Sequence, residues 1–158
     1  GNGTTFYVRI PNSIVTTNIE SSVKKLIKNS TASIADYKIL IAEDDEISFF
    51  YLENILENVT KKIIRAKNGF EAIELLKKNT DIDVILMDIK MPLLNGFEAT
   101  KAIRKFNTTV YIIAQTAYIQ ESFKIKAEEA GCNTFISKPI DKQKLIRLLA
   151  DVKKNDLE

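Results

Sequence analysis

The chain has 158 residues, a length that favours one domain with an additional segment. Hydrophobic residues make up 45% and charged residues 28%, and the net charge of +2 gives no sign of a nucleic-acid or acidic partner. Histidine is absent, which excludes Ser-His-Asp catalysis, histidine metal ligation and a phosphohistidine made within the chain. The single cysteine, Cys132, excludes an intrachain disulfide and a cysteine zinc cluster.

Residues 1–36 differ in composition from the rest of the chain. Residues 5–10 predict one β-strand, which Pro11 ends, and residues 12–36 are rich in Ser, Thr, Asn and Lys. That composition predicts a linker, interrupted by a short amphipathic piece that carries Val23, Leu26 and Ile27. Because the chain begins with glycine rather than methionine, we expect it to be part of a longer protein. No apolar run reaches the roughly 18 residues that a membrane span needs.

From Lys38 onward, short apolar strands alternate with amphipathic stretches. The predicted strands are residues 38–42, 62–66, 84–87, 110–114 and 134–137. Alternation of this kind is typical of βαβ units, so we predict an α/β fold with a doubly wound, five-stranded parallel sheet and helices on both faces. The expected arrangement is flavodoxin-like with strand order 2-1-3-4-5, which brings the ends of the first and third strands together.

Five helices are expected between and after these strands, each with an apolar face towards the sheet. The first helix is predicted to bury Ile47, Tyr51, Ile55 and Val59. The second is capped at Asn68-Gly69 and is predicted to bury Phe70, Ile73 and Leu76. The third begins near Gly96 and buries Phe97, Thr100 and Ile103. The fourth, residues 121–130, ends at Gly131 and buries Phe123, Ala127 and Ala130. The fifth follows a cap at Asp141 and buries Leu145, Leu148, Leu149 and Val152.

Polar residues follow four of the predicted strands. Acidic residues 43–45 come after the first strand, Asp88 after the third, Thr116 after the fourth and Lys138 after the fifth. Because the carboxyl ends of parallel strands meet at one edge, we expect these side chains to share a pocket. Glu43, Asp44 and Asp88 suit a hard cation such as Mg²⁺, which prefers oxygen ligands and is often held by carboxylates together with a phosphate. Acids are also favoured at a helix start, and this is the better interpretation of Asp45 and Glu46.

The order and spacing of these motifs over residues 37–154 resemble the receiver domain of two-component response regulators. The resemblance implies that Asp88 is the phosphoacceptor in a phosphorelay, assisted by Thr116 and Lys138. It implies that Mg²⁺ or Mn²⁺ is the cofactor, held by Glu43, Asp44, Asp88 and the backbone carbonyl of Lys90. It also implies a conformational switch through Thr116 and Phe135, and a cis peptide bond between Lys138 and Pro139.

Residues 1–11, with the motif Gly1-Asn2-Gly3-Thr4-Thr5-Phe6, resemble the end of a histidine-kinase ATP-binding domain. The order of kinase, linker (12–36) and receiver (37–154) is that of a hybrid histidine kinase. The resemblance implies that a histidine kinase or phosphotransfer domain is the partner, and that the receiver catalyses its own phosphorylation and dephosphorylation. It implies a cytoplasmic domain of a parent protein anchored in the inner membrane. This chain itself is expected to contact neither nucleic acid nor the membrane. The resemblance also allows a homodimer through the face formed by the fourth helix, fifth strand and fifth helix.

We expect the donor to dock on the helix after the first strand, with Ser48 and Phe49 as exposed contacts. Three alternatives remain at this stage. One is a receiver-like docking or dimerisation module that phosphorylation does not regulate. An aspartyl phosphatase of similar sheet type would need a second acid at the position of Lys90. A flavin-binding domain would need a phosphate-binding loop where residues 43–45 would instead repel the flavin phosphate.

Overall fold

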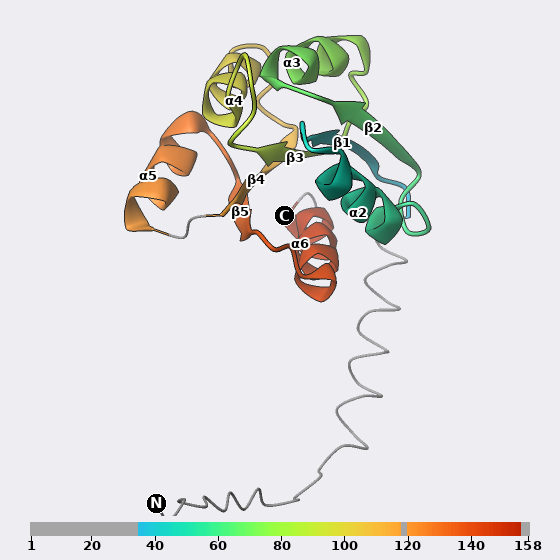
Figure 1. The fold of residues 1–158 in the computed structure, drawn as a ribbon. Helices are drawn as coiled ribbons and strands as arrows, with labels where there is room; N and C mark the ends of the chain where they lie inside the picture. Colours follow the sequence, from blue (N-terminus) through green and yellow to red (C-terminus); the bar gives the residue numbers. More distant parts are fainter. Residues whose placement is uncertain (1–34, 118–119, 156–158) are drawn as a thin grey trace, which may run out of the picture.

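A computed structural model describes residues 35–117 and 120–155 and shows a central parallel sheet with helices on both faces (Figure 1). The strand predicted at 5–10 and the linker helix near Val23 lie outside the described residues. Within the described part of the chain, none of the helices combines the length and apolar character required to cross a bilayer.

The sheet has the predicted order, β2-β1-β3-β4-β5, and every neighbouring pair is parallel. Its strands are β1 (Lys38–Ala42), β2 (Lys62–Ala66), β3 (Val84–Asp88), β4 (Tyr111–Thr116) and β5 (Thr134–Ser137). The strand order reverses between β1 and β3, which is where open sheets of this type place their ligands. Strand β4 extends beyond the predicted residue 114, so that Thr116 is the last residue of the strand itself.

The helices are α2 (Glu46–Leu56), α3 (Gly69–Lys78), α4 (Gly96–Arg104), α5 (Glu121–Ala130) and α6 (Lys142–Asn155). Helices α2 and α6 cover one face of the sheet, and α3, α4 and α5 cover the other (Figure 1). Four helices begin with a side-chain oxygen that accepts a hydrogen bond from the backbone N–H three residues later, at Asp45, Asn68, Asn95 and Asp141. The predicted stop at Gly131 has a left-handed backbone with φ of 94°, which glycine adopts without steric cost.

Alternate residues of each central strand contribute to two hydrophobic clusters. In β1, Ile39 and Ile41 pack under α2 and α6, whereas Leu40 and Ala42 pack under α3 and α4. Side chains alternate between the two faces of a strand, so a strand covered on both faces has to be apolar at every position. This explains why β1 and β3 are continuous apolar runs in the sequence.

The predicted inward face of α2 is wrong at most positions. Ile47 is 80% exposed and Tyr51 is also exposed, Val59 lies beyond the helix, and only Ile55 of the predicted set is buried. An α-helix has 3.6 residues per turn, so each step of four residues rotates by about 40° and a run of three such steps leaves the original face. The buried face of α2 is formed by Phe49, Leu52, Ile55 and Leu56.

The other helices match the prediction more closely. Phe70 is exposed at the first turn of α3, where Gly69, Ala72 and Leu76 are the buried residues, and Ile73 is half-buried. Each step of three residues falls short of a full helical turn, so two such steps rotate Phe70 about the helix axis away from the face that contains Leu76. Phe97 of α4 and Leu148 of α6 were predicted to be buried and are half-buried. The other predicted core residues of α4, α5 and α6 are buried.

The two apolar sets of α2 provide a test of this packing. We predict that Leu52→Ala, at a residue 1% exposed, lowers the free energy of unfolding by about 2–5 kcal/mol because it leaves a cavity in the core. Ile47→Ala removes a solvated side chain and is expected to change that free energy by less than about 0.5 kcal/mol. Urea unfolding of both variants measures the difference, and a larger effect at Ile47 than at Leu52 would contradict the packing.

Candidate functional site

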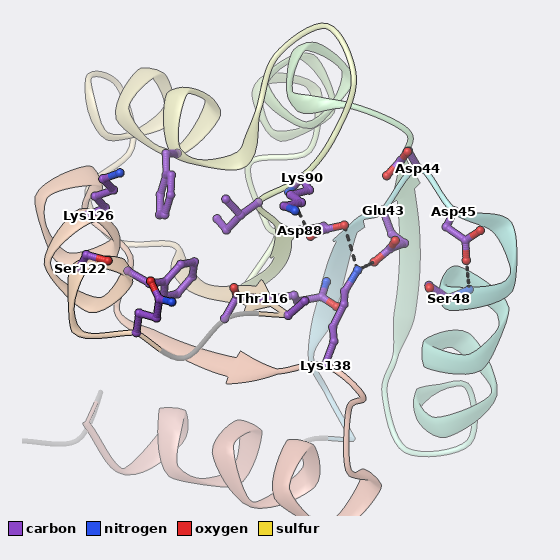
Figure 2. Close-up of a pocket in the computed structure, with 16 residues that line it drawn as sticks. Glu43, Asp44, Asp45, Ser48, Asp88, Lys90, Thr116, Ser122, Lys126 and Lys138 are labelled. Atoms are coloured by element: carbon purple, nitrogen blue, oxygen red, sulfur yellow. Dashed lines mark hydrogen bonds and ion pairs between the residues drawn. The ribbon is translucent and has the colours of Figure 1, made fainter.

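The ends of β1, β3, β4 and β5 surround a pocket of about 510 Å³, here called the acid pocket (Figure 2). It brings together most of the predicted site residues, although they come from four separate segments of the sequence. The lining residues are Glu43, Asp44, Asp45, Ser48, Asp88, Ile89, Lys90, Phe97, Gln115, Thr116, Ala117, Gln120, Ser122, Phe123, Lys126 and Lys138.

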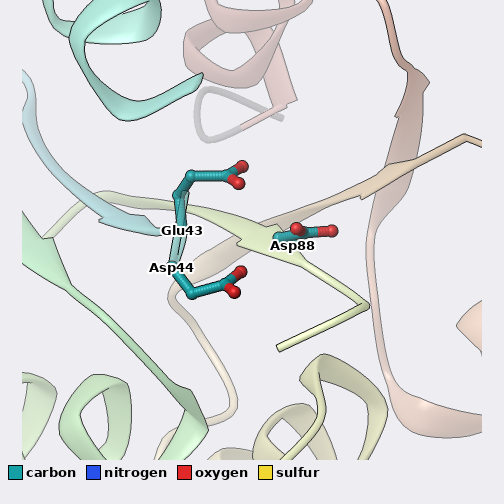
Figure 3. Close-up of side chains that lie close together, drawn as sticks. All are labelled: Glu43, Asp44 and Asp88. Carbon is teal, nitrogen blue, oxygen red and sulfur yellow. The ribbon is translucent and has the colours of Figure 1, made fainter. Parts of the chain in front are cut away.

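Three carboxylates converge in this pocket (Figure 3). Glu43 and Asp44 follow β1 directly and Asp88 ends β3, and one oxygen of each lies within 4.8 Å of the others. Glu43 and Asp88 are buried, whereas Asp44 is exposed. Burial raises the pKa of Glu43, and the nearby charges of Asp88 and Asp44 also raise it, while the hydrogen bond from Lys138 acts in the opposite direction. The cluster is therefore stabilised by positive charge placed among the carboxylates.

Lys138 supplies part of that charge (Figure 2). Its ammonium group donates to Glu43 Oε2 at 2.7 Å and to Asp88 Oδ2 at 2.9 Å, and its backbone N–H donates to the carbonyl of Thr116 at 2.7 Å. Burial opposes the charge on Lys138, but the hydrogen bonds to Asp88 and Glu43 outweigh burial and raise its pKa. The Lys138 ammonium is therefore shared between the two buried carboxylates of the cluster. The peptide bond between Lys138 and Pro139 is cis, as predicted.

The turn after β3 folds back onto Asp88. The N–H of Lys90 donates to Asp88 Oδ1 at 3.2 Å, and the N–H of Gly96 donates to the carbonyl of Ile89 at 3.1 Å. A Cβ atom on Gly96 would lie 2.3 Å from the Asp88 carbonyl oxygen, which no side chain tolerates. Glycine at this position thus permits α4 to begin directly against the residue that carries the central carboxylate.

Of the two predicted switch residues, Thr116 lines the pocket, whereas Phe135 lies outside its lining and packs near α5. Thr116 is buried at the end of β4 and lines the pocket. Phe135 is half-buried, and its ring centroid lies 5.9 Å from that of Phe123, which in turn lies 5.5 Å from that of Phe97. Phe97 and Phe123 line the pocket, so three aromatic rings connect its wall to β5. The sequence pattern identified Phe123 and Phe97 only as core residues.

Asp45 caps α2, as the sequence predicted for a helix start. Its carboxylate accepts a hydrogen bond from the N–H of Ser48 at 2.7 Å, and this bond lowers the pKa of Asp45. Glu46, the next residue, pairs with Arg65 and Lys67 rather than with the acid cluster. Of the four consecutive acids, only Glu43 and Asp44 belong to the cluster.

The prediction that Phe49 is exposed is wrong. Its side chain is 6% exposed and packs in the core of the α2 face, with the Arg65 guanidinium 4.4 Å from its ring centroid. Two adjacent aromatic residues at 49 and 50 leave the sequence unable to say which one points inward. The exposed apolar residues of α2 are instead Ile47, Phe50 and Tyr51. Ser48 is half-buried and lines the acid pocket.

A second cavity of about 340 Å³, here called the apolar groove, separates α2 from the segment that follows β5. The Tyr51 hydroxyl donates to the carbonyl of Ile140 at 2.9 Å and connects its two sides. The groove adjoins the acid pocket, because Ser48, Gln115 and Lys138 line both. Its lining residues are Ile47, Ser48, Tyr51, Leu52, Gln115, Lys138, Pro139 and Ile140.

Comparison with known proteins gives consistent matches. A family model described as the response regulator receiver domain matches residues 39–150. The chemotaxis protein CheY of Halobacterium salinarum is 36% identical over 115 residues, which cover 73% of this chain and 95% of that protein. The autoinducer 2 sensor kinase/phosphatase LuxQ of Vibrio parahaemolyticus is 34% identical over 163 residues, which cover 99% of this chain but only 18% of that kinase.

A solved structure shows the same fold with a partner. In the co-crystal structure of the Saccharomyces cerevisiae histidine phosphotransfer signalling protein Ypd1 with the receiver domain of Ssk1, one chain aligns with a TM-score of 0.71 and 31% identity. The alignment covers 75% of this chain and 89% of that chain.

Proposed function

This chain belongs to the response regulator receiver domains, and we propose that Asp88 is its phosphoacceptor in a two-component phosphorelay. The observation that carries the proposal is the position of the Asp88 carboxylate. It ends a central strand and lies 2.9 Å from the Lys138 ammonium, beside two further carboxylates that suit a divalent cation. An aspartyl phosphatase would need a second acid two residues after Asp88, where Lys90 stands, and the carboxylates of residues 43–45 would repel a flavin phosphate.

The proposed reaction is an in-line transfer from a phosphohistidine. One oxygen of the Asp88 carboxylate attacks the phosphorus, an oxygen–phosphorus bond forms, and the nitrogen–phosphorus bond of the donor breaks with its electron pair left on the imidazole. Catalysis of phosphoryl transfer is mostly positioning and electrostatic stabilisation. Lys138 supplies a positive charge next to the attacking oxygen, and the Thr116 hydroxyl faces the same pocket.

The donor set fits Mg²⁺. The carboxylates of Glu43, Asp44 and Asp88 are oxygen ligands that leave room for waters and a phosphoryl oxygen, with the backbone carbonyl of Lys90 as the further proposed contact. Burial, together with the charges of Asp88 and Asp44, raises the pKa of Glu43, and a cation between the carboxylates would act in the opposite direction. When bound, the cation would supply charge against the oxygens of the transferring group.

We further propose that phosphorylation acts on the face of the sheet that carries α5. A phosphoryl group on Asp88 offers an acceptor to the Thr116 hydroxyl, and movement of Thr116 shifts the end of β4. The rings of Phe97, Phe123 and Phe135 adjoin that strand end and provide a packed path towards β5. Phenylalanine at 135 brings no hydroxyl, so the switch rests on ring packing alone.

The phosphoryl donor is a histidine outside the chain, since the chain has none. The match to LuxQ covers 99% of this chain and therefore includes most of residues 1–34, which supports a sensor kinase of the hybrid type as the parent protein. A short flexible linker would give an effective donor concentration of the order of mM. A donor that is charged from ATP places the receiver on the cytoplasmic side of the membrane.

The donor is proposed to dock on α2 beside the apolar groove. Ile47 and Tyr51 are exposed, line the groove, and lie next to the acid pocket through Ser48 and Lys138. Exposed apolar residues grouped beside a functional pocket are typical of an interaction site. The co-crystal structure of a yeast receiver domain with a histidine phosphotransfer protein supports a donor of that kind for this chain.

Replacement of the proposed acceptor is the direct test of the function. Asp88→Asn is expected to lose phosphorylation by acetyl phosphate, because the amide is not a nucleophile. Intact-mass spectrometry after incubation with acetyl phosphate and Mg²⁺ measures the adduct. Asp45→Asn is the matched control, because asparagine also caps a helix and the variant is expected to keep the adduct. An adduct that persists in Asp88→Asn would refute the assignment.

The acid cluster predicts a specific response to Mg²⁺. A ligand that binds only the folded state stabilises it, by about 2.7 kcal/mol at 100 times its Kd. We therefore expect saturating Mg²⁺ to raise the melting temperature of the wild-type protein. Asp44→Asn is expected to lose most of that gain, because it removes a proposed Mg²⁺ ligand. When a chelator has removed the Mg²⁺, the variant should be at least as stable as the wild type, because it relieves repulsion within the cluster. Asp45→Asn should retain the gain, and equal responses of the two variants would place the cation elsewhere.

The docking proposal separates two routes of phosphorylation. The donor in this test is a phosphohistidine protein that labels the wild-type chain. Ile47→Asp is expected to slow transfer from that donor about tenfold or more, which is the effect of losing a strong interface contact. Labelling by acetyl phosphate should be unchanged, because Ile47 does not line the acid pocket. Ile125→Asp is the control, since Ile125 is also exposed but lies on α5. Equal slowing of both routes, or of both variants, would contradict docking on α2.

A further inference from the structure

Gln115 is a fully buried polar residue within the central sheet. It lies in β4 between Ala114 and Thr116 and is 0% exposed. Neither its amide oxygen Oε1 nor its amide nitrogen Nε2 has a hydrogen-bond partner in the described part of the structure. A buried amide without partners costs free energy, which leucine or methionine at the same position would avoid. Buried polar groups without partners are uncommon in folded proteins, so this one requires a physical explanation.

The strand register places this amide next to the proposed acceptor. Gln115 pairs with Asp88 of β3. Side chains alternate along a strand, and Ile113 and Leu86, two residues before Gln115 and Asp88, both pack under α2 and α6. Gln115 and Asp88 therefore project from the same face of the sheet, on neighbouring strands and at the same level.

The two cavities converge on the same residue. Gln115 and Lys138 both line the acid pocket and the apolar groove, so the two residues lie where these cavities adjoin. The Lys138 ammonium has three N–H donors, of which two have partners among the described residues, Glu43 Oε2 and Asp88 Oδ2. Both of those acceptors are carboxylates, which attract an ammonium more strongly than a neutral amide does.

We propose that Gln115 is a positioning residue for Lys138 in the phosphorylated protein. Formation of an acyl phosphate removes the charge from the Asp88 oxygens and weakens the contact that now holds the ammonium. Lys138 then distributes its three donors among Glu43, a phosphoryl oxygen and Oε1 of Gln115. The amide that lacks a partner before phosphorylation gains one after it. This inference rests on the proposed function of Asp88 and adds a residue that the sequence pattern did not identify.

The test compares the free protein with the protein that carries a phosphoryl analogue. Mg²⁺ with beryllium fluoride, which mimics a phosphoryl group on a carboxylate, is titrated while the melting temperature is followed. Gln115→Met, which is nearly isosteric, is expected to raise the melting temperature of the free protein by about 2–4 °C, since it removes a buried amide without partners. The same change is expected to raise the half-saturating concentration of beryllium fluoride roughly tenfold, as for loss of one hydrogen bond to a charged group.

Two further variants and the wild type make the result decisive. Gln115→Leu should reproduce both effects with a different side-chain shape. Thr100→Val removes a buried hydroxyl from α4 on the opposite face of the sheet and should leave the half-saturating concentration unchanged. The role of Gln115 is overturned if both variants keep the wild-type half-saturating concentration of beryllium fluoride, or if both melt at a lower temperature than the free wild-type protein. Either result leaves the proposed function of Asp88 intact. Absence of any shift in the wild-type protein overturns the proposed function together with this inference.

Discussion

The site depends on an imbalance of charge at the carboxyl edge of the sheet. Three carboxylates lie within reach of one cation, two of them buried, and a single ammonium stands among them. Repulsion of this kind persists in a folded protein only where the surrounding structure enforces it. Here the enforcement comes from the neighbouring ends of β1 and β3, whose positions follow from the strand order of the whole domain.

Lys138 connects that charge cluster to the far side of the sheet. Its ammonium reaches Glu43, directly after β1, and Asp88, the last residue of β3, while its backbone N–H donates to the carbonyl of Thr116 in β4. One residue of the segment after β5 therefore joins the ends of three other strands. A change in the charge or size of Asp88 acts on Lys138 and Thr116 together, which is a physical basis for coupling chemistry at β3 to structure at β4 and β5.

The two faces of the sheet have different surroundings near the pocket. The α2 side carries the apolar groove, the exposed Ile47 and the buried amide of Gln115. The α5 side carries the rings of Phe97 and Phe123. In the proposed function, the donor approaches from the first side and the phosphorylated state is transmitted through the second. The central strands thus lie between the surface proposed for docking and the aromatic rings proposed for the switch.

The order of the strands and helices, and the strand ends that meet at one edge, could be predicted from the sequence alone. Strands, helix caps at Asn68 and Asp141, and the stop at Gly131 depend on local backbone chemistry, and residues at parallel strand ends must meet at one edge. Three features could be learned only from the folded chain: which side of α2 is buried, that Phe49 rather than Phe50 points inward, and that the Gln115 amide has no partner among the described residues. A helix with apolar residues on several sides can rotate about its axis, and packing against the sheet selects one rotation. Whether a buried amide finds a partner depends equally on groups brought near it from distant segments, which no local pattern contains.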